Sequence, residues 1–282
     1  MIERDRAPAV KSDPSPVGFL GWGSASAVLN RLLLAAHGGA ARPLRVFLPV
    51  RAAAPPAGVR IVASVEALLA EPGVVIVDLS STDWRAVLPA LRLAISDRNV
   101  LVLAGHGISI GAALKQLHER KIVRCVVTPH REPEEAILAF HPARWVSAQD
   151  AAAFRSMFGH IAHVLELREE AQFDVVRALS GIAPAVLYTL ADALADGALM
   201  MGLPRAQALS FLSGVMLGAA RAMTGAEHPA VLRDTALEAE PAAAGLMELE
   251  SAGARGLMMR VVDQAVRQVR RGDRAESAPD ED

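Results

Sequence analysis

The pattern of apolar positions changes character near residue 168. Before that point, near-continuous apolar runs alternate with segments of helical spacing, as is typical of strands buried on both faces of a parallel sheet. The runs are VGFLG (17–21), LRVFLPV (44–50), VVIVDL (74–79), VLVLAG (100–105), IVRCVV (122–127), AILAF (136–140) and HVLEL (163–167). The helical segments are Ala25–Ala36, Val65–Ala70, Trp84–Ser96, Ile110–Arg120 and Ala148–Phe158. The pattern predicts an α/β doubly wound sheet over residues 16–168.

After residue 168 the β pattern disappears and apolar residues recur at helical spacing. The predicted helices are Glu169–Leu179, Ala185–Met201, Arg205–Thr224, Pro229–Leu237, Pro241–Ser251 and Ala254–Arg271. Several are apolar nearly all round, and a helix without a wet face must be covered on every side. We therefore expect residues 169–271 to form the interface of an obligate homodimer, with higher oligomers left open. The charged, proline- and alanine-rich segments 1–15 and 272–282 are expected to be disordered.

Composition argues against several kinds of partner. The formal net charge of −2 gives no general attraction to nucleic acid or anionic lipid. The longest uncharged apolar stretch, Ala206–Ala220, has 15 residues, and a membrane span needs about 20. The single cysteine, Cys125, lies in an apolar run, where a buried thiol is expected, and excludes an intrachain disulfide. With no secretory signal visible in the opening residues, we expect a cytoplasmic protein without membrane or nucleic-acid partners.

A glycine-containing turn follows the first predicted strand and opens a predicted helix, which is the setting of a dinucleotide-binding fingerprint. The turn consists of Gly21, Trp22, Gly23, Ser24, Ala25 and Ser26. Gly21 permits a tight turn, Gly23 lets the backbone approach a pyrophosphate, and the helix N-terminus offers free N–H groups to the anion. Ser26 replaces the third glycine but is small enough for the helix to pack, whereas Trp22 would either cap the cofactor or obstruct it. The alternative is an ordinary tight turn.

The end of the second strand bears on the choice of cofactor. It reads Leu48-Pro49-Val50-Arg51 and lacks the acidic residue that holds the ribose hydroxyls in NAD-specific sites. Arg51 could pair with a 2′-phosphate, so NADP is expected, with NAD possible. The alternative for Arg51 is an exposed loop arginine.

The helical half resembles pyrroline-5-carboxylate reductase in three stretches: ALSGIAPAVLYTLADALADGALMMGLPRAQAL (178–209), LGAARAM (217–223) and HPAVLRD (228–234). The order of elements before them also fits, so the resemblance covers about residues 16–271. It implies an N-terminal Rossmann-type sheet, a C-terminal all-helical dimerisation domain, and hydride transfer from NAD(P)H to the C=N carbon of a cyclic imine. At matching positions it implies that Leu79, Ser80 and Gly105 contact the cofactor. It places Ser180, Ile182, Ala183, Glu238, Ala242 and Ala243 at the substrate.

The chain departs from the family where a threonine–serine–proline–glycine–glycine–threonine–threonine stretch would receive the substrate carboxylate. Residues 237–244 read LEAEPAAA and lack those hydroxyls, and Pro241 removes one N–H. Glu240 would satisfy the remaining amides itself. Two like charges about 4 Å apart cost about 4 kcal/mol at an effective dielectric near 20, about a thousandfold in binding. An imine without this carboxylate is therefore expected in preference to 1-pyrroline-5-carboxylate; the alternative is a catalytically silent dimer with a binding or regulatory role.

Three side chains are candidates for chemistry in this site. His106 follows a sheet strand and could protonate an imine nitrogen, or it could be an exposed turn histidine. Glu240 could act as proton donor or hold a cationic substrate, or it could simply cap its own helix. Tyr188 would face either the pocket or the core. Asp192 and Asp196 have near metal-ligand spacing but no further ligands nearby in sequence, so no metal is predicted.

Overall fold

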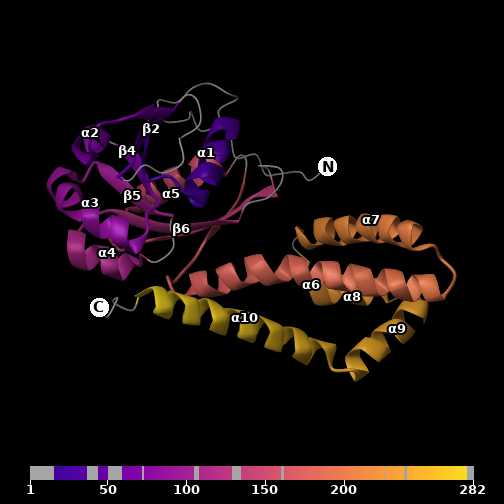
Figure 1. The fold of residues 1–282 in the computed structure, drawn as a ribbon. Helices are drawn as coiled ribbons and strands as arrows, with labels where there is room; N and C mark the ends of the chain where they lie inside the picture. Colours follow the sequence, from indigo (N-terminus) through magenta and orange to yellow (C-terminus); the bar gives the residue numbers. More distant parts are fainter. Residues whose placement is uncertain are drawn as a thin grey trace. The chain divides into compact units, whose positions relative to one another are not determined.

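The computed structural model describes residues 16–36, 44–49, 59–71, 73–104, 108–128, 135–159, 162–225, 227–237 and 240–277. The chain forms two compact units that divide between Val176 and Arg177, rather than at the expected residue 168. The first contains the sheet and the second is helical (Figure 1).

The sheet has eight strands in the order β3-β2-β1-β4-β5-β6-β7-β8. Their bounds are β1 Val17–Leu20, β2 Leu44–Phe47, β3 Val59–Ile61, β4 Gly73–Val77, β5 Asn99–Leu103, β6 Ile122–Thr128, β7 Ile137–Pro142 and β8 His163–Glu166. Strands β1 to β6 are parallel, and β1 pairs on one side with β2 and on the other with β4. This 3-2-1-4-5-6 order defines the doubly wound Rossmann fold. All seven predicted strands are present, and the short, largely exposed β3 is an addition.

Strand β7 corrects the expectation of a parallel sheet, because it runs antiparallel to β6, with Phe140 opposite Cys125. Only residues 129–136 separate the two strands, whereas a parallel crossover needs a dozen residues or more. Strand β8 is again parallel to β7, after an intervening helix.

Two apolar layers cover the faces of the sheet. Phe19 of β1 belongs to one layer and the next residue, Leu20, to the other, because successive strand side chains point to opposite faces. The Phe19 layer receives Leu29 and Phe154, and the Leu20 layer receives Leu91. The helices are α1 Ser24–Ala36 and α5 Ala148–Phe158 on the first face, and α2 Val65–Leu69, α3 Ser81–Ala94 and α4 Ile110–Leu117 on the second.

The helical unit contains most of α6 (Gln172–Met200), then α7 (Arg205–Met223), α8 (Pro229–Ala236), α9 (Glu240–Ser251) and α10 (Ala254–Ser277). The predicted break at Ser180-Gly181 is wrong, because α6 continues through Gly181 and Pro184. Proline removes a single backbone donor, and the good helix formers on both sides maintain the helix. Helix α10 extends to Ser277, so residues 272–277 are helical rather than part of a disordered tail.

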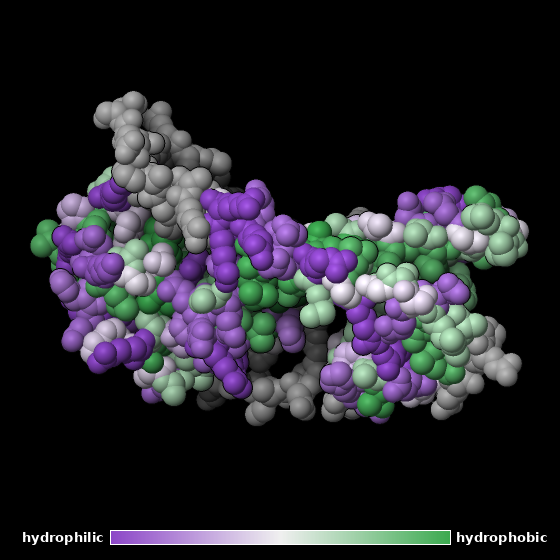
Figure 2. All heavy atoms as spheres, turned by 90° about the horizontal axis from the view of Figure 1, so that it is seen from below, coloured by the Kyte–Doolittle hydropathy of each residue, from purple (hydrophilic) through white to green (hydrophobic). Residues whose placement is uncertain are grey.

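The helical unit has almost no core of its own. Among the described residues beyond 176, the buried hydrophobic side chains are only three alanines, Ala178, Ala195 and Ala208. Large apolar side chains are exposed instead, including Tyr188 at 74% and Phe211 at 70%, and Figure 2 shows such apolar surface in green. Packing of Tyr188 into the core of its own chain is therefore wrong. By length and composition, α6 could also cross a membrane.

Candidate functional site

The first strand ends beside the fourth, at the point where the strand order reverses. Ligands of open α/β sheets bind at the carboxyl ends of the strands at such a point. The Gly21 N–H donates to the Phe47 carbonyl at 2.9 Å, and the Asp78 N–H donates to the Leu20 carbonyl at 3.0 Å. The backbone thereby fixes the turn after β1 and the residue after β4 next to each other.

The Asp78 carboxylate occupies the N-terminus of α1. Its Oδ2 accepts hydrogen bonds from the Gly23 N–H at 3.0 Å and the Ser26 N–H at 2.7 Å. The first N–H groups of a helix have no partner within it, and they carry the positive end of the helix dipole. An acid of the chain itself therefore sits where the fingerprint predicts a phosphate.

The two glycines of the turn are required for different reasons. Gly21 has a φ of +84°, and a Cβ there would lie 2.4 Å from both the Asp78 carbonyl oxygen and Leu79 Cδ2. A Cβ on Gly23 would lie 2.8 Å and 2.9 Å from the two carboxylate oxygens of Asp78. The predicted close approach at Gly23 is present, but the group that approaches is Asp78.

The remaining residues of the turn lie against the core or the surface. The Trp22 ring is half-buried and meets the Phe19 ring edge to face, with centroids 4.9 Å apart. Ser24 is exposed and Ala25 half-buried. Ser26 is fully buried, and its hydroxyl oxygen has no hydrogen-bond partner among the described residues.

The residues after β4 have structural contacts of their own. Leu79 is buried in the Leu20 layer. Ser80 caps α3: its hydroxyl accepts from the Asp83 N–H at 3.1 Å and donates to the Asp83 carboxylate at 2.8 Å. The proposed cofactor residues Arg51 and Gly105, and the candidate proton donor His106, lie outside the described residues.

The proposed substrate residues lie on α6 and at the start of α9. Ser180, Ile182 and Ala183 are half-buried within α6, and Tyr188 is exposed one to two turns further on. In α9, Ala242 is exposed and Ala243 half-buried. Glu240 is the first residue of α9, but its side chain and all of Glu238 lie outside the described part of the chain, so the capping role of Glu240 stays a prediction.

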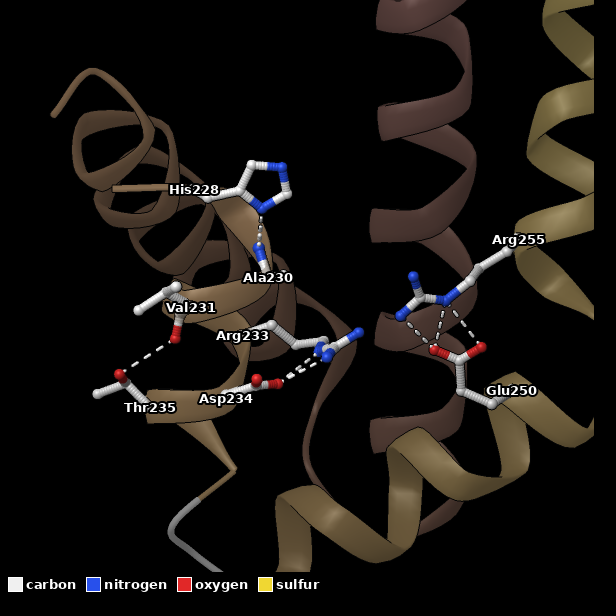
Figure 3. Close-up of polar contacts among 8 residues, drawn as sticks. All are labelled: His228, Ala230, Val231, Arg233, Asp234, Thr235, Glu250 and Arg255. Atoms are coloured by element: carbon white, nitrogen blue, oxygen red, sulfur yellow. Dashed lines mark hydrogen bonds and ion pairs between the residues drawn. The ribbon is translucent and has the colours of Figure 1, made fainter. Parts of the chain in front are cut away.

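Several polar residues of the helical unit form structural pairs, some of them drawn in Figure 3. The Nδ1 of His228 accepts from the Ala230 N–H at 3.2 Å and caps α8, and Arg233 pairs with Asp234 at 2.6 Å. Arg255 of α10 binds Glu250 of α9 at 2.6 Å. Two further acids, Asp192 and Asp196, both bind the Arg205 guanidinium. Within the described ranges, no group of three acidic, histidine or cysteine side chains gathers as a metal site.

Comparison with known proteins finds similarity first for the helical unit and then for the whole chain. The family model described as pyrroline-5-carboxylate reductase dimerisation matches residues 170–271. Pyrroline-5-carboxylate reductase of Arabidopsis thaliana is 28% identical over 270 residues, which is 93% of this chain and 96% of that protein. The human pyrroline-5-carboxylate reductase 2 is 26% identical over 88% of this chain and 80% of its own length. Residues 170–271 therefore match the dimerisation domain of this family, and the whole chain is similar to pyrroline-5-carboxylate reductases.

Solved pyrroline-5-carboxylate reductases share the fold. The structure from Coxiella burnetii superposes with a TM-score of 0.75 at 20% identity, covering 92% of this chain and 98% of that one. The structure from Plasmodium falciparum, which has NADP bound, superposes with a TM-score of 0.69 at 20% identity, covering 94% and 98%. At these identities the likeness establishes the Rossmann sheet followed by a helical domain, and no more.

The glycine turn of this chain fits a dinucleotide phosphate only in part. The backbone fits, because Gly21 makes the tight turn and the N–H groups of Gly23 and Ser26 converge on one point. The side chain does not, because that point is taken by an Asp78 oxygen. A phosphate can reach these amides only if Asp78 leaves them.

Proposed function

We propose that this protein is an NAD(P)H-dependent reductase that transfers a hydride to the C=N carbon of a cyclic imine. The observation that carries the proposal is the glycine turn opening α1 at the switch point of a 3-2-1-4-5-6 sheet. Relatives that match over 93% of the chain are named pyrroline-5-carboxylate reductase, and one structural neighbour has NADP bound.

The chain would contribute mainly by binding and orientation. The nicotinamide supplies the hydride when the cofactor is bound. The α1 amides would hold the cofactor phosphates, and Arg51 would favour NADP through its 2′-phosphate. His106, after β5, would protonate the imine nitrogen. Arg51→Ala should raise the Kd for NADPH while leaving that for NADH within about twofold, and an equal loss for both cofactors would contradict the role of Arg51.

An imine without a carboxylate near α9 is the proposed substrate class. The N-terminus of α9 carries Glu240, Pro241, Ala242 and Ala243, so it offers no hydroxyl donors and lacks the N–H that Pro241 removes. NADPH oxidation would be followed with pyrroline-5-carboxylate and with cyclic imines that lack the acid. Glu240→Gln should improve the KM for pyrroline-5-carboxylate at least about tenfold by removing the like charge, while the neutral imines serve as the control. Inactivity toward every imine would contradict the reductase.

We further infer a homodimer formed through the helical unit. The family model for residues 170–271 is named for dimerisation. Beyond residue 176, the described hydrophobic residues that a single chain buries are only alanines. Burying one large apolar side chain contributes about 1.5–3 kcal/mol, so a second copy over several of them would supply the missing core. Packing against a second copy would explain the exposed apolar side chains of α6 as well as a membrane would. The two acids of α6 that bind Arg205 favour the dimer.

The oligomeric state can be measured by sedimentation of the full chain without detergent. Phe211→Asp, at a side chain 70% exposed in the single chain, should convert dimer to monomer. Asp97→Asn, a change at a carboxylate 81% exposed in the sheet unit, should not. A wild-type monomer, or a protein extracted only by detergent, would contradict this assembly.

The second candidate function is a catalytically silent dimer with a binding or regulatory role. The occupation of the α1 amides by Asp78 favours it, since a carboxylate there stabilises the ligand-free turn. Calorimetry with NADPH and NADH separates the two functions. Binding of neither cofactor at millimolar concentration would favour the silent protein.

A further inference from the structure

We propose that Asp78 is a built-in competitor of the cofactor pyrophosphate and sets the affinity of this protein for dinucleotides. The inference rests on the proposed use of NAD(P)H. It concerns the Asp78 carboxylate and the two backbone amides that donate to it, those of Gly23 and Ser26. The residue is a determinant of affinity, and the structure places it at the switch point rather than in a remote part of the fold.

One oxygen, Oδ2, accepts from both amides, at 3.0 Å from Gly23 N and 2.7 Å from Ser26 N. The other oxygen also lies close to Gly23, since a Cβ built there would be 2.9 Å from Oδ1. Among the described residues, no arginine or lysine forms an ion pair with Asp78. The helix N-terminus is therefore the partner that stabilises the charge of this carboxylate.

A phosphate and this carboxylate cannot share the amides. A phosphate oxygen within hydrogen-bonding distance of both N–H groups would occupy the position of Oδ2. Two like charges about 4 Å apart weaken binding about a thousandfold at an effective dielectric near 20. The carboxylate must consequently move before a pyrophosphate can bind.

Only the side chain of Asp78 is free to make this movement. Its N–H is bonded to the Leu20 carbonyl at 3.0 Å, as a continuation of the β1–β4 pairing. Its carbonyl oxygen lies close to Gly21, 2.4 Å from the position that a Cβ would take there. The peptide group between Val77 and Asp78 is held in the sheet, because the Val77 carbonyl also accepts from the Ala104 N–H at 2.9 Å. Dinucleotide binding would therefore require a rotation about χ1 that breaks both hydrogen bonds of the carboxylate. The same rotation returns the carboxylate to the amides when the ligand leaves.

The experiment measures the Kd of the full-length protein for NADPH and for NADH by calorimetry. The variants are Asp78→Asn, which keeps the shape and an acceptor oxygen but removes the charge, and Asp78→Ala, which empties the position. Asp97→Asn is the matched control, because it removes the same charge at the opposite, amino end of the sheet, where Asp97 pairs with Arg120. Thermal melting of each variant verifies that it is folded.

Both Asp78 variants should bind NADPH at least about tenfold more tightly than the wild type, the effect of one charge-assisted interaction at a helix N-terminus. NADH should gain by the same factor, because the two cofactors share the pyrophosphate and differ at the 2′-phosphate. The Kd of Asp97→Asn should stay within about twofold of wild type, since exposed charges beyond a Debye length are screened.

Three results would overturn the inference, and they differ in what they say about the reductase. If the wild type binds the cofactor measurably and the Asp78 variants bind it equally or more weakly, the proposed competition is contradicted. The proposed use of NAD(P)H would then still stand. A gain confined to NADPH would assign the effect to the 2′-phosphate instead. Absence of binding in the wild type and both Asp78 variants would remove the inference together with the proposed cofactor.

Discussion

A methyl group added at Gly23 should destabilise the sheet unit only while Asp78 is present. The Cβ of Gly23→Ala would lie 2.8 Å from Oδ2, 2.9 Å from Oδ1 and 3.0 Å from Cγ of Asp78. The carboxylate must then leave its two amides. A hydrogen bond to a charged group contributes about 1.5–3 kcal/mol, so two of them contribute about 3–6 kcal/mol. Partial exposure lowers that value, and we expect the free energy of unfolding to fall by about 2–3 kcal/mol.

In an Asp78→Ala background, the Cβ of Gly23→Ala meets none of these atoms, so the substitution should lower the free energy of unfolding by less than about 1 kcal/mol. The double-mutant cycle should therefore give a coupling energy of about 2 kcal/mol between positions 23 and 78. Urea unfolding followed by tryptophan fluorescence is suited to this measurement, because Trp22, Trp84 and Trp145 all lie in the sheet unit.

Gly111→Ala is the matched control for the cycle. Its Cβ would have only the Ser109 hydroxyl oxygen nearby, at 4.0 Å, so we expect a change in the free energy of unfolding within about 1 kcal/mol. An equal loss from Gly23→Ala in both backgrounds would refute the contact between Gly23 and the Asp78 carboxylate.

Three further predictions concern residues away from the turn. Glu170→Ala should lower the free energy of unfolding, measured in urea, by about 2–4 kcal/mol, because it leaves the largely buried Arg124 guanidinium and the Ile110 N–H without their carboxylate partner. The control, Glu169→Ala, should have little effect. Burial raises the pKa of the Cys125 thiol to about 12, so the folded protein should not react with a thiol reagent at pH 8. The protonated thiol of Cys125 contributes fully to stability below the ordinary thiol pKa. Between about pH 9 and 12 this contribution is lost, so the free energy of unfolding should fall by up to about 1.4 kcal/mol per pH unit. Cys125→Ala should remove this dependence of the free energy of unfolding on pH. Arg205→Gln, which breaks two exposed ion pairs, should lower the free energy of unfolding by less than about 1 kcal/mol, and added salt should narrow the difference in circular-dichroism melts.

Local patterning was sufficient to predict the buried strands of the sheet, but not the short, exposed β3 or the direction of β7. Each buried strand can be recognised by a run of apolar residues such as IVRCVV, because both faces of the strand are covered. The antiparallel direction of β7 depends on the length of the loop before it, and apolar runs carry no information on direction. The continuity of α6 across Gly181 and Pro184 has a similar origin, since two unfavourable residues do not interrupt a helix that favourable neighbours extend on both sides.

The glycine turn was predicted, but the acid that fills it was not. Hydrogen bonds from Gly23 and Ser26 to Asp78 span 55 and 52 residues, so no local spacing reveals them. The available signal was topological. If β4 follows β1 in the sheet, as the doubly wound order requires, the residue after β4 comes to lie beside the turn after β1. An aspartate at that position is then a candidate for the helix N-terminus.

From the sequence, the same electrostatic argument was applied to a different helix, α9. There Glu240 was expected to take the place of a substrate carboxylate. The side chain of Glu240 lies outside the described residues and its role stays a prediction, whereas Asp78 approaches α1 from the end of β4 and satisfies two amides with one oxygen. Such a contact stabilises the ligand-free turn and opposes an anionic ligand. Loss of Asp78 should therefore lower stability and strengthen cofactor binding together. A residue whose side chain holds the cofactor would weaken binding when removed, so the sign of the change in affinity separates an internal competitor from a ligand-binding residue.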